Sequence, residues 1–262
     1  MVSRHICTAL VSAVIGMVFF TPAASSAETC VPEEVAEVRY VICTVDPKTA
    51  DLRMFWKNDA DEAHRTFTNI ETSVKETGKV LTFAINAGMF AEDFTPIGLF
   101  VEDGRALTPV NTRKVTERPL PNFYRRPNGI FLIGDKSASI LTTEAYEKTR
   151  PEAKFATQSG PMLVIDGKLH PDFIKGSTDR TRRSGVGTCR DGMVRFAITD
   201  GIVNFHDFAS LFRDHLKCDD ALFLDGGRGV GLFDAATNRK DWSGHGGFGP
   251  VIGLVEPAKT PD

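Results

Sequence analysis

The residues best suited to chemistry in this sequence are polar side chains that stand beside glycine at the ends of apolar segments. Asp225 follows the apolar run at 221–224 and precedes two glycines. A carboxylate held at the end of a buried strand can act as a nucleophile, a base or a ligand for a cation. The N–H groups of Gly226 and Gly227 can bind an anion, and glycine lets a ligand approach the main chain closely. The pattern predicts a functional site at Asp225, with a purely structural tight turn as the competing interpretation.

Two further segments repeat the pattern of a polar side chain beside glycine, which indicates one composite site. Asn86 begins the sequence NAGMF, and Gln158 begins the sequence QSGPML. Amide side chains can hold sugar hydroxyls or phosphate oxygens through hydrogen bonds. The alternative is that these amides only serve the turns in which they lie. The further candidates for binding a substrate or its phosphate are Ser159, Gly160 and Asn128.

Arginines stand near these turns in a chain that is otherwise mildly acidic, with 31 Lys plus Arg against 34 Asp plus Glu. Arg182 and Arg183 precede a predicted strand, and Arg228 lies inside the glycine turn. A guanidinium group binds phosphate through two parallel hydrogen bonds, so this grouping favours an anionic substrate. A solvated, arginine-rich loop is the other interpretation. The chain has no basic stripe of the kind that binds nucleic acid, and we expect no nucleic-acid partner.

Residues 1–27 predict a signal peptide and therefore an exported protein. A short basic start is followed by an apolar run at 6–20 and by small residues that end at Ala27. The apolar run is short for a membrane span, and no later segment is long and apolar enough to cross a membrane. An uncleaved anchor is the alternative. We expect a soluble mature chain in the periplasm or secreted from the cell, and the sequence does not predict its oligomeric state.

Four cysteines follow the predicted signal peptide, namely Cys30, Cys43, Cys189 and Cys218. An even number in an oxidising compartment predicts two disulfides, for which three pairings are possible. We favour Cys30 with Cys43, which lies in an apolar strand near the mature start, and Cys189 with Cys218, which flank neighbouring strands. A reactive thiol is the alternative. No cysteine or histidine has metal-ligand spacing, so no cofactor is predicted. Calcium bound at Asp225 is an alternative, but the sequence has no cluster of carboxylates that would support it.

Short strands joined by turn signals dominate the predicted secondary structure. Hairpins are predicted across residues 46–47, 103–104, 166–167 and 190–192. The first of them joins strands at 37–45 and 51–56. Helices are predicted only at 59–75, 143–149 and 205–216, and the last has Asn204 as its cap. These patterns predict the α+β class, with a single domain built around a mixed, mostly antiparallel β-sheet and a few helices.

Six short motifs that contain glycine follow one another along the chain. They are NAGMF at 86–90, PIGL at 96–99, NGIF at 128–131, QSGPML at 158–163, RSGVG at 183–187 and LDGG at 224–227. In this order they resemble the phosphodiester glycosidase domain family over roughly residues 80–255, and the chain looks most like exported bacterial members. The resemblance implies a site built from Asn86, Gln158, Arg183 and Asp225, with the turn of Gly226 and Gly227.

The chain departs from the family pattern immediately after these two glycines. Many relatives continue with small or hydroxyl residues, commonly serine, where this chain has Arg228, Gly229 and Val230. Arg228 would then either add a contact to phosphate or block the pocket. With the resemblance, the chain divides into a signal peptide at 1–27, an N-terminal hairpin and helix at 28–79, a phosphodiester glycosidase-like core at 80–256 and a tail at 257–262. Residues 111–126 are expected to form a surface loop or a lid.

The resemblance implies a hydrolase that cleaves the glycosidic bond of a sugar-1-phosphodiester or a related phosphorylated glycan. A phosphate monoester is a stable leaving group, so the reaction needs less general acid than ordinary glycoside hydrolysis. The catalytic residues would be Arg183, which stabilises the leaving phosphate, Asp225, which acts on the sugar or the water, and Asn86, which orients a hydroxyl. Two alternatives remain: a non-catalytic periplasmic binding protein for anionic glycans, and an envelope protein whose glycine turns are only structural.

Overall fold

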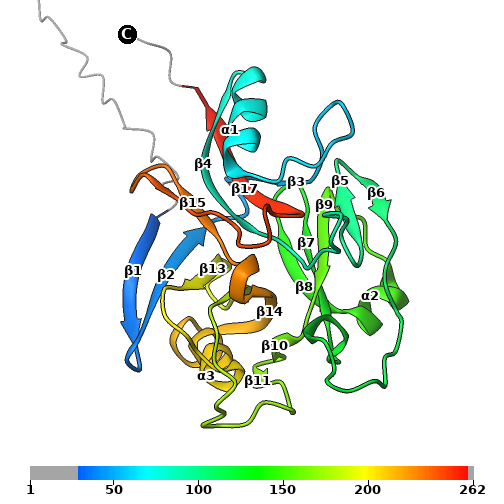
Figure 1. The fold of residues 1–262 in the computed structure, drawn as a ribbon, viewed down its shortest axis with the longest axis vertical. Coiled ribbons are helices and arrows are strands. Elements are labelled where there is room, and N and C mark those ends of the chain that lie inside the picture. The colour runs from blue at the N-terminus through cyan, green and yellow to red at the C-terminus, as the bar shows by residue number, and fades with distance from the viewer. Residues whose placement is uncertain (1–28, 259–262) are drawn as a thin grey trace, which may run out of the picture.

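The computed structural model describes residues 29–258, and the predicted signal peptide at 1–27 lies outside them. Seventeen strands, three short α-helices and a few single turns make up the described part of the chain. The strands form three sheets, of seven, five and five strands, in which each pairing between neighbours is antiparallel (Figure 1). The predicted α+β class with mostly antiparallel strands is confirmed. The strands divide among three sheets because a twisted open sheet of this many strands would not pack onto a single core.

The seven-stranded sheet contains the strand that ends in the glycine turn. Its order is β1 (Thr29–Val35), β2 (Val38–Val45), β13 (Val194–Thr199), β12 (Arg183–Cys189), β14 (Cys218–Gly226), β10 (Met162–Ile165) and β11 (Lys168–Leu169). The central strands β12 and β14 are buried along most of their length, as their small and apolar residues predict. Asp225 therefore leaves the sheet from a strand that is held on both sides.

The two five-stranded sheets supply the remaining motifs. One has the order β16 (Arg239–Lys240), β15 (Leu232–Asp234), β4 (Lys79–Asn86), β17 (Val251–Pro257) and β3 (Asp51–Phe55). The other has the order β6 (Arg105–Thr108), β5 (Phe100–Glu102), β9 (Phe155–Ser159), β7 (Gly129–Ile133) and β8 (Ala138–Thr142). Asn86 thus ends a strand of one sheet, and Gln158 lies near the end of a strand of the other.

One hydrophobic core joins the three sheets. The ring of Phe196 in β13 lies 5.2 Å from the ring of Phe83 in β4 and 6.0 Å from that of Phe131 in β7, measured between centroids. All three rings are almost completely buried. Because each comes from a different sheet, all three sheets share one buried cluster, and the chain forms a single domain.

The three α-helices are short and begin at caps that the sequence encodes. In α1 (Phe67–Glu76) the side chain of Thr66 accepts a hydrogen bond from the N–H of Asn69. This cap explains why the helix predicted at 59–75 begins later. The helix lies on β4, and its buried side chains also pack with Val251 and Val255 of β17 (Figure 1). α2 (Thr143–Thr149) follows the cap Thr142. α3 (Phe205–Ser210) follows the predicted cap Asn204 and continues into a π-helical turn at Leu211–His215.

The hairpin predicted between residues 37–45 and 51–56 is wrong. β2 pairs with β1 and β13, whereas β3 pairs with β17 in a different sheet. The N-terminal hairpin instead joins β1 to β2 through Ala36 and Glu37, whose φ angles are 50° and 62°. Two-residue turns with positive φ normally carry Asn, Asp or Gly, so this turn has no signal in the sequence. The predicted hairpins across 103–104 and 166–167, which have Asp-Gly turns, are confirmed.

Both predicted disulfide pairings are confirmed. Cys30 is bonded to Cys43, its direct partner in the β1–β2 ladder, and Cys189 is bonded to Cys218, its direct partner between β12 and β14. The second bond ties the beginning of β14 to the strand beside it. The strand that carries Asp225 is therefore covalently anchored at its far end.

Candidate active site

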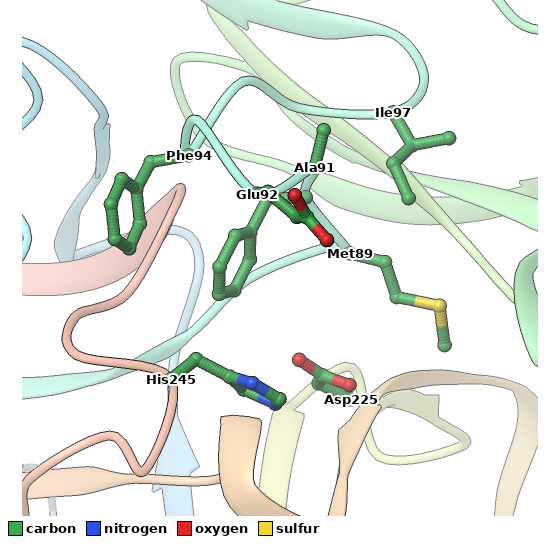
Figure 2. A pocket seen from close by; sticks show the side chains of 8 residues that line it. Met89, Ala91, Glu92, Phe94, Ile97, Asp225 and His245 are labelled. Atoms are coloured by element: carbon green, nitrogen blue, oxygen red, sulfur yellow. The ribbon is translucent and has the colours of Figure 1, made fainter.

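Asp225 opens onto a pocket of about 460 Å³ between two loops and the end of β14 (Figure 2). The loop between β4 and β5 contributes six of the eight lining residues, among them Phe90, Glu92 and Phe94. Asp225 and His245 complete the lining. A volume of this size is typical of a small-molecule site and accommodates a sugar ring. Of the residues predicted from the sequence, Asp225 alone lines this pocket.

The glycine turn holds the Asp225 carboxylate close to the main chain. Oδ1 accepts a hydrogen bond of 2.7 Å from the N–H of Gly226. A Cβ atom on Gly229 would overlap Oδ2, so any other residue at that position would displace the carboxylate. The N–H of Gly227 donates to the carbonyl of Arg182 at 2.9 Å. The two N–H groups that were predicted to bind an anion are therefore both engaged within the protein.

The environment of Asp225 favours a neutral carboxyl group. Burial raises its pKa to about 7, and the hydrogen bond from the Gly226 N–H lowers it only in part. No charged side chain in the described residues offsets the loss of solvation. A carboxyl group with this pKa exchanges its proton near neutral pH, which suits a general acid or base.

Asn86 supports the strand end rather than the pocket. It is buried at the end of β4, where its Nδ2 donates to Ser184 Oγ at 2.9 Å and its Oδ1 accepts from the N–H of Gly231 at 3.2 Å. Ser184 Oγ in turn lies 3.3 Å from both the backbone N and the backbone O of Asp225. Asn86 therefore reaches Asp225 through Ser184, across two sheets.

Gln158 has no hydrogen-bonding capacity left for a ligand. Its Oε1 accepts from the N–H groups of Leu99 at 3.0 Å and Asn111 at 2.8 Å. Its Nε2 donates to the carbonyl of Asn111 at 2.9 Å and to Thr143 Oγ1 at 3.0 Å. The side chain is buried, and it anchors the start of the long loop at 111–128. By bonding to Leu99, Asn111 and Thr143, its amide holds three segments of the chain together, which is a structural role.

The other residues predicted around Gln158 are also packed inside the protein. Ser159 Oγ donates to the carbonyl of Leu224 at 2.8 Å, next to Asp225 in β14. Asn128 Nδ2 donates to the carbonyl of Phe123 at 2.8 Å. A Cβ on Gly160 would lie 2.5 Å from the Asn128 Cβ, so glycine is required where these segments meet. The group stabilises the junction between β9 and the pocket strand.

Arg183 is buried away from the pocket. Its Nε donates to the carbonyl of Val203 at 2.9 Å, and its Nη2 donates to the carbonyl of Asp179 at 3.2 Å. The guanidinium carbon lies 3.6 Å from the ring centroid of Phe205. The pKa of Arg183 is lowered to about 10, mainly by burial; the charge of Asp179 opposes this shift and the positive charge of Arg125 adds to it. The side chain is not among those that line the pocket.

The remaining two candidate arginines are engaged elsewhere. Arg182 Nη2 lies 3.6 Å from Asp241 Oδ2, and its Nε donates to the carbonyl of Thr199. The exposed Arg228 donates to the carbonyl of Gly244, which turns its side chain onto the loop at 243–246. Arg228 therefore neither lines nor blocks the pocket in this structure.

Glu92 and His245 are two ionisable residues of the pocket that were not predicted from the sequence. Glu92 lies two residues beyond the NAGMF motif, so an inspection of the residues that follow each motif would have found it. His245 was considered only as a metal ligand, and its distance from Asp225 along the chain gives no signal. Among residues 29–258, no group of three or more His, Cys, Asp or Glu side chains could hold a metal ion.

Within the part of the chain that the structure describes, none of the helices has the length and hydrophobicity of a membrane span.

Residues 79–253 match the model of a protein family, the phosphodiester glycosidases. The chain is also 32% identical over 183 residues to the uncharacterized protein YigE of Escherichia coli strain K12, a match that covers 70% of each chain. The pocket and all the candidate residues except Cys30 and Cys43 lie within the family match.

Two solved structures share the fold. The catalytic domain of zebrafish N-acetylglucosamine-1-phosphodiester alpha-N-acetylglucosaminidase, auto-inhibited by its pro-peptide, matches 90% of this chain and 84% of that one with a TM-score of 0.60 and 16% identity. A hypothetical protein from Synechocystis matches 86% of this chain and 61% of that one, with a TM-score of 0.54 and 13% identity. At such low identity these likenesses show the fold alone.

Proposed function

Because the chain belongs to the phosphodiester glycosidase family, we propose that it is an exported hydrolase that cleaves the glycosidic bond of a sugar-1-phosphodiester or a related phosphorylated glycan. The observation that carries this proposal is the position of Asp225. Its carboxyl group, with a pKa raised to about 7, opens onto a pocket of about 460 Å³. The zebrafish enzyme named for hydrolysis of an N-acetylglucosamine phosphodiester has the same fold, which supports this reaction class.

In the proposed reaction the sugar ring occupies the pocket with its anomeric carbon near Asp225. The bond from that carbon to the bridging oxygen breaks, and the oxygen leaves as part of a phosphate monoester. A water molecule adds to the carbon, and ionised Asp225 takes the proton that the water releases. The monoester is a stable leaving group, so one proton-transferring carboxylate satisfies the main requirement of the reaction.

The other predicted catalytic residues are proposed to position Asp225 rather than to touch the substrate. Asn86 holds Ser184, which contacts the backbone of Asp225 on both its N and O atoms. Arg183 holds the neighbouring end of β12, where it is the ladder partner of Gly226. A small displacement of these strand ends would move the carboxylate relative to the sugar, and such displacements cost catalytic rate.

Export is proposed on the basis of the two disulfides, which persist in oxidising compartments. The periplasm or the extracellular space is the expected location, with residues 1–27 removed as a signal peptide. Fractionation of cells that produce the full chain, followed by mass determination of the mature N-terminus, tests this part of the proposal. A chain found uncleaved in the cytoplasm would contradict it.

The central test is turnover of a panel of sugar-1-phosphodiesters by the mature protein and by Asp225→Asn. We expect the wild type to release free sugar and a phosphate monoester, and the variant to be slower by about 100- to 10,000-fold, the usual contribution of a general base. Asp93→Asn is the matched control, because Asp93 is an exposed neighbour of the pocket that does not line it. Circular dichroism checks the fold of each variant. Full activity in Asp225→Asn would refute the assignment.

One observation favours the alternative of a binding protein without turnover. None of the three candidate arginines lines the pocket, and the N–H groups of Gly226 and Gly227 are engaged, so the groups expected to stabilise a leaving phosphate do not face it. Substrates that raise the melting temperature of the wild type without any release of sugar would favour this alternative.

A further inference from the structure

The ionisable side chains that line the pocket carry acidic charge on two opposite walls. Asp225 lies at the end of β14, and Glu92 lies across the opening, on the loop between β4 and β5. Figure 2 shows the carboxyl group of Glu92 turned inward, toward the side of the pocket where Asp225 stands. His245 is the third ionisable residue of the lining, and no lysine or arginine belongs to it.

Glu92 is held in place by its backbone, while its carboxyl group has no partner among the described residues. The loop that carries it closes through hydrogen bonds from the N–H of Ala91 to the carbonyl of Thr95 and from the N–H of Ile97 to the carbonyl of Met89. No hydrogen bond or ion pair engages the Glu92 side chain within residues 29–258. An exposed and unpaired carboxylate at a pocket wall is available to a ligand.

Two arginines lie beside residues of the pocket, and each donates to a backbone carbonyl rather than to these carboxylates. Arg65 lies outside the pocket over the ring of Phe94, at 4.4 Å from its centroid, and donates to the carbonyl of Gly246. Arg228 donates to the carbonyl of Gly244. The carboxyl group of Asp225 accordingly has no cationic partner, and burial is the main influence on its pKa.

Aromatic rings form much of the remaining wall. Phe90 and Phe94 are stacked with their centroids 5.7 Å apart, and His245 meets the Phe90 ring edge-on at 6.2 Å. The Arg65 guanidinium already lies over one face of Phe94, so the rings supply an apolar wall, which can cover the apolar face of a sugar. The two carboxylates, Glu92 and Asp225, are what favour a positively charged group on the part of the ligand that enters this pocket.

We therefore infer that the pocket selects an amino sugar, whose ammonium group lies between the carboxylates of Glu92 and Asp225; this inference rests on the proposed function because it concerns the same pocket. Glu92 is the residue that determines this specificity. An ammonium ion beside Asp225 would also favour the ionised carboxylate, which is the form that accepts a proton from water. A sugar that bears a carboxylate would be repelled by the same two residues.

The test compares three substrates that share a methyl phosphodiester: the 1-phosphodiester of glucose, that of glucosamine, which has an amine at C2, and that of glucuronic acid, which has a carboxylate at C6. They are assayed at about pH 7, where a substantial fraction of Asp225 is ionised and an amine with a pKa of about 8 is still mostly protonated. We expect kcat/KM for glucosamine to exceed that for glucose by about 10-fold or more, since a single close charge pair is worth at least this factor in a partly desolvated site. Glucuronic acid should be the poorest substrate.

Two variants show whether Glu92 is responsible. In Glu92→Gln the ratio of kcat/KM between the glucosamine and glucose substrates should fall to less than about 3-fold, because one of the two attracting charges is gone. Asp93→Asn is the matched control one residue away. Its amide oxygen can still accept the hydrogen bond from the N–H of Thr95, so the loop keeps its shape and the ratio should be unchanged.

Different results would contradict this inference and the proposed function. A wild type that hydrolyses the glucose substrate as fast as the glucosamine substrate, or a Glu92→Gln variant with the full preference, would overturn the inference and leave the glycosidase proposal intact. If none of the three substrates is hydrolysed, the proposed function fails. Calorimetric binding of the same three compounds then decides the inference: tighter binding of the glucosamine compound supports it, and equal binding overturns it.

Discussion

Asp225 and Arg183 lie at neighbouring positions of two paired strands, but their side chains enter opposite environments. Arg183 is the ladder partner of Gly226, the residue after Asp225. Burial shifts the pKa of both groups toward the neutral form, to about 7 for the aspartate and about 10 for the arginine. The guanidinium of Arg183 has two carbonyl acceptors and lies over the Phe205 ring, whereas the carboxylate of Asp225 has one donor and an open pocket.

A buried charged group with a shifted pKa therefore marks a functional residue only when part of its hydrogen-bonding capacity is unused and faces a pocket. Gln158 and Glu92 repeat this contrast in their hydrogen bonding. All four hydrogen bonds of the Gln158 amide are made within the protein, while the Glu92 carboxyl group faces the pocket without a partner. Saturated groups stabilise the fold, and unsaturated ones are available for binding or catalysis.

Replacement of Arg183 by methionine tests the structural side of this comparison. We expect a loss of about 3 kcal/mol in the free energy of unfolding, because the change removes two charge-assisted hydrogen bonds from a buried site, to the carbonyls of Val203 and Asp179. Urea denaturation measures this loss. The folded fraction should keep far more activity than Asp225→Asn. If Arg183→Met instead unfolds like the wild type but loses all turnover, Arg183 contacts the substrate and the comparison fails.

The pH dependence of stability tests the description of Asp225. The folded-state pKa of Asp225 is about 7, above the value of 3.8 expected for an unperturbed aspartate, so the folded protein favours the protonated carboxyl group. The contribution of this group to stability is complete below about pH 4 and is lost as the pH rises through 7. The loss is about 1.4 kcal/mol for each pH unit between the unfolded and the folded pKa. Asn at position 225 cannot ionise and should abolish this loss.

Melting temperatures of the wild type and Asp225→Asn, measured from pH 4 to pH 8, give the comparison directly. The variant should become more stable relative to the wild type as the pH increases through neutrality. Parallel curves over this range would mean that Asp225 is ionised normally in the folded protein, and its distinction from an ordinary surface carboxylate would be lost.

Replacement of Arg228 by serine should have the smallest effect. Arg228 is exposed, and its side chain donates a single hydrogen bond to the carbonyl of Gly244. Loss of an exposed contact of this kind changes the unfolding free energy by less than about 0.5 kcal/mol. We also expect turnover to stay within about 2-fold, the scale of such a small free-energy change. A large gain in turnover would show that Arg228 obstructs the pocket in solution.

Local features of this protein were predictable because adjacent residues encode them. The Asp-Gly turns at 103–104 and 166–167 combine two residues that tolerate positive φ, and the side chain of Asn204 caps α3 by a bond to Asp207 three residues away. The pairing of Cys189 with Cys218 followed from predicted neighbouring strands, and that of Cys30 with Cys43 from the strand near the mature start that contains Cys43. The position of Asp225 between a buried strand and a glycine turn was also evident from the sequence.

Features that depend on distant segments were decided by tertiary structure. The sequence determined that the chain forms short strands with Asp225 at the end of one, since turns and apolar runs are local. It did not determine that Arg183 turns into the core, that the Asn86 amide meets Ser184 across 98 residues, or that Glu92 and His245 face Asp225. The partner of a polar side chain depends on which segments pack against it, and that is settled only when three sheets close around one core.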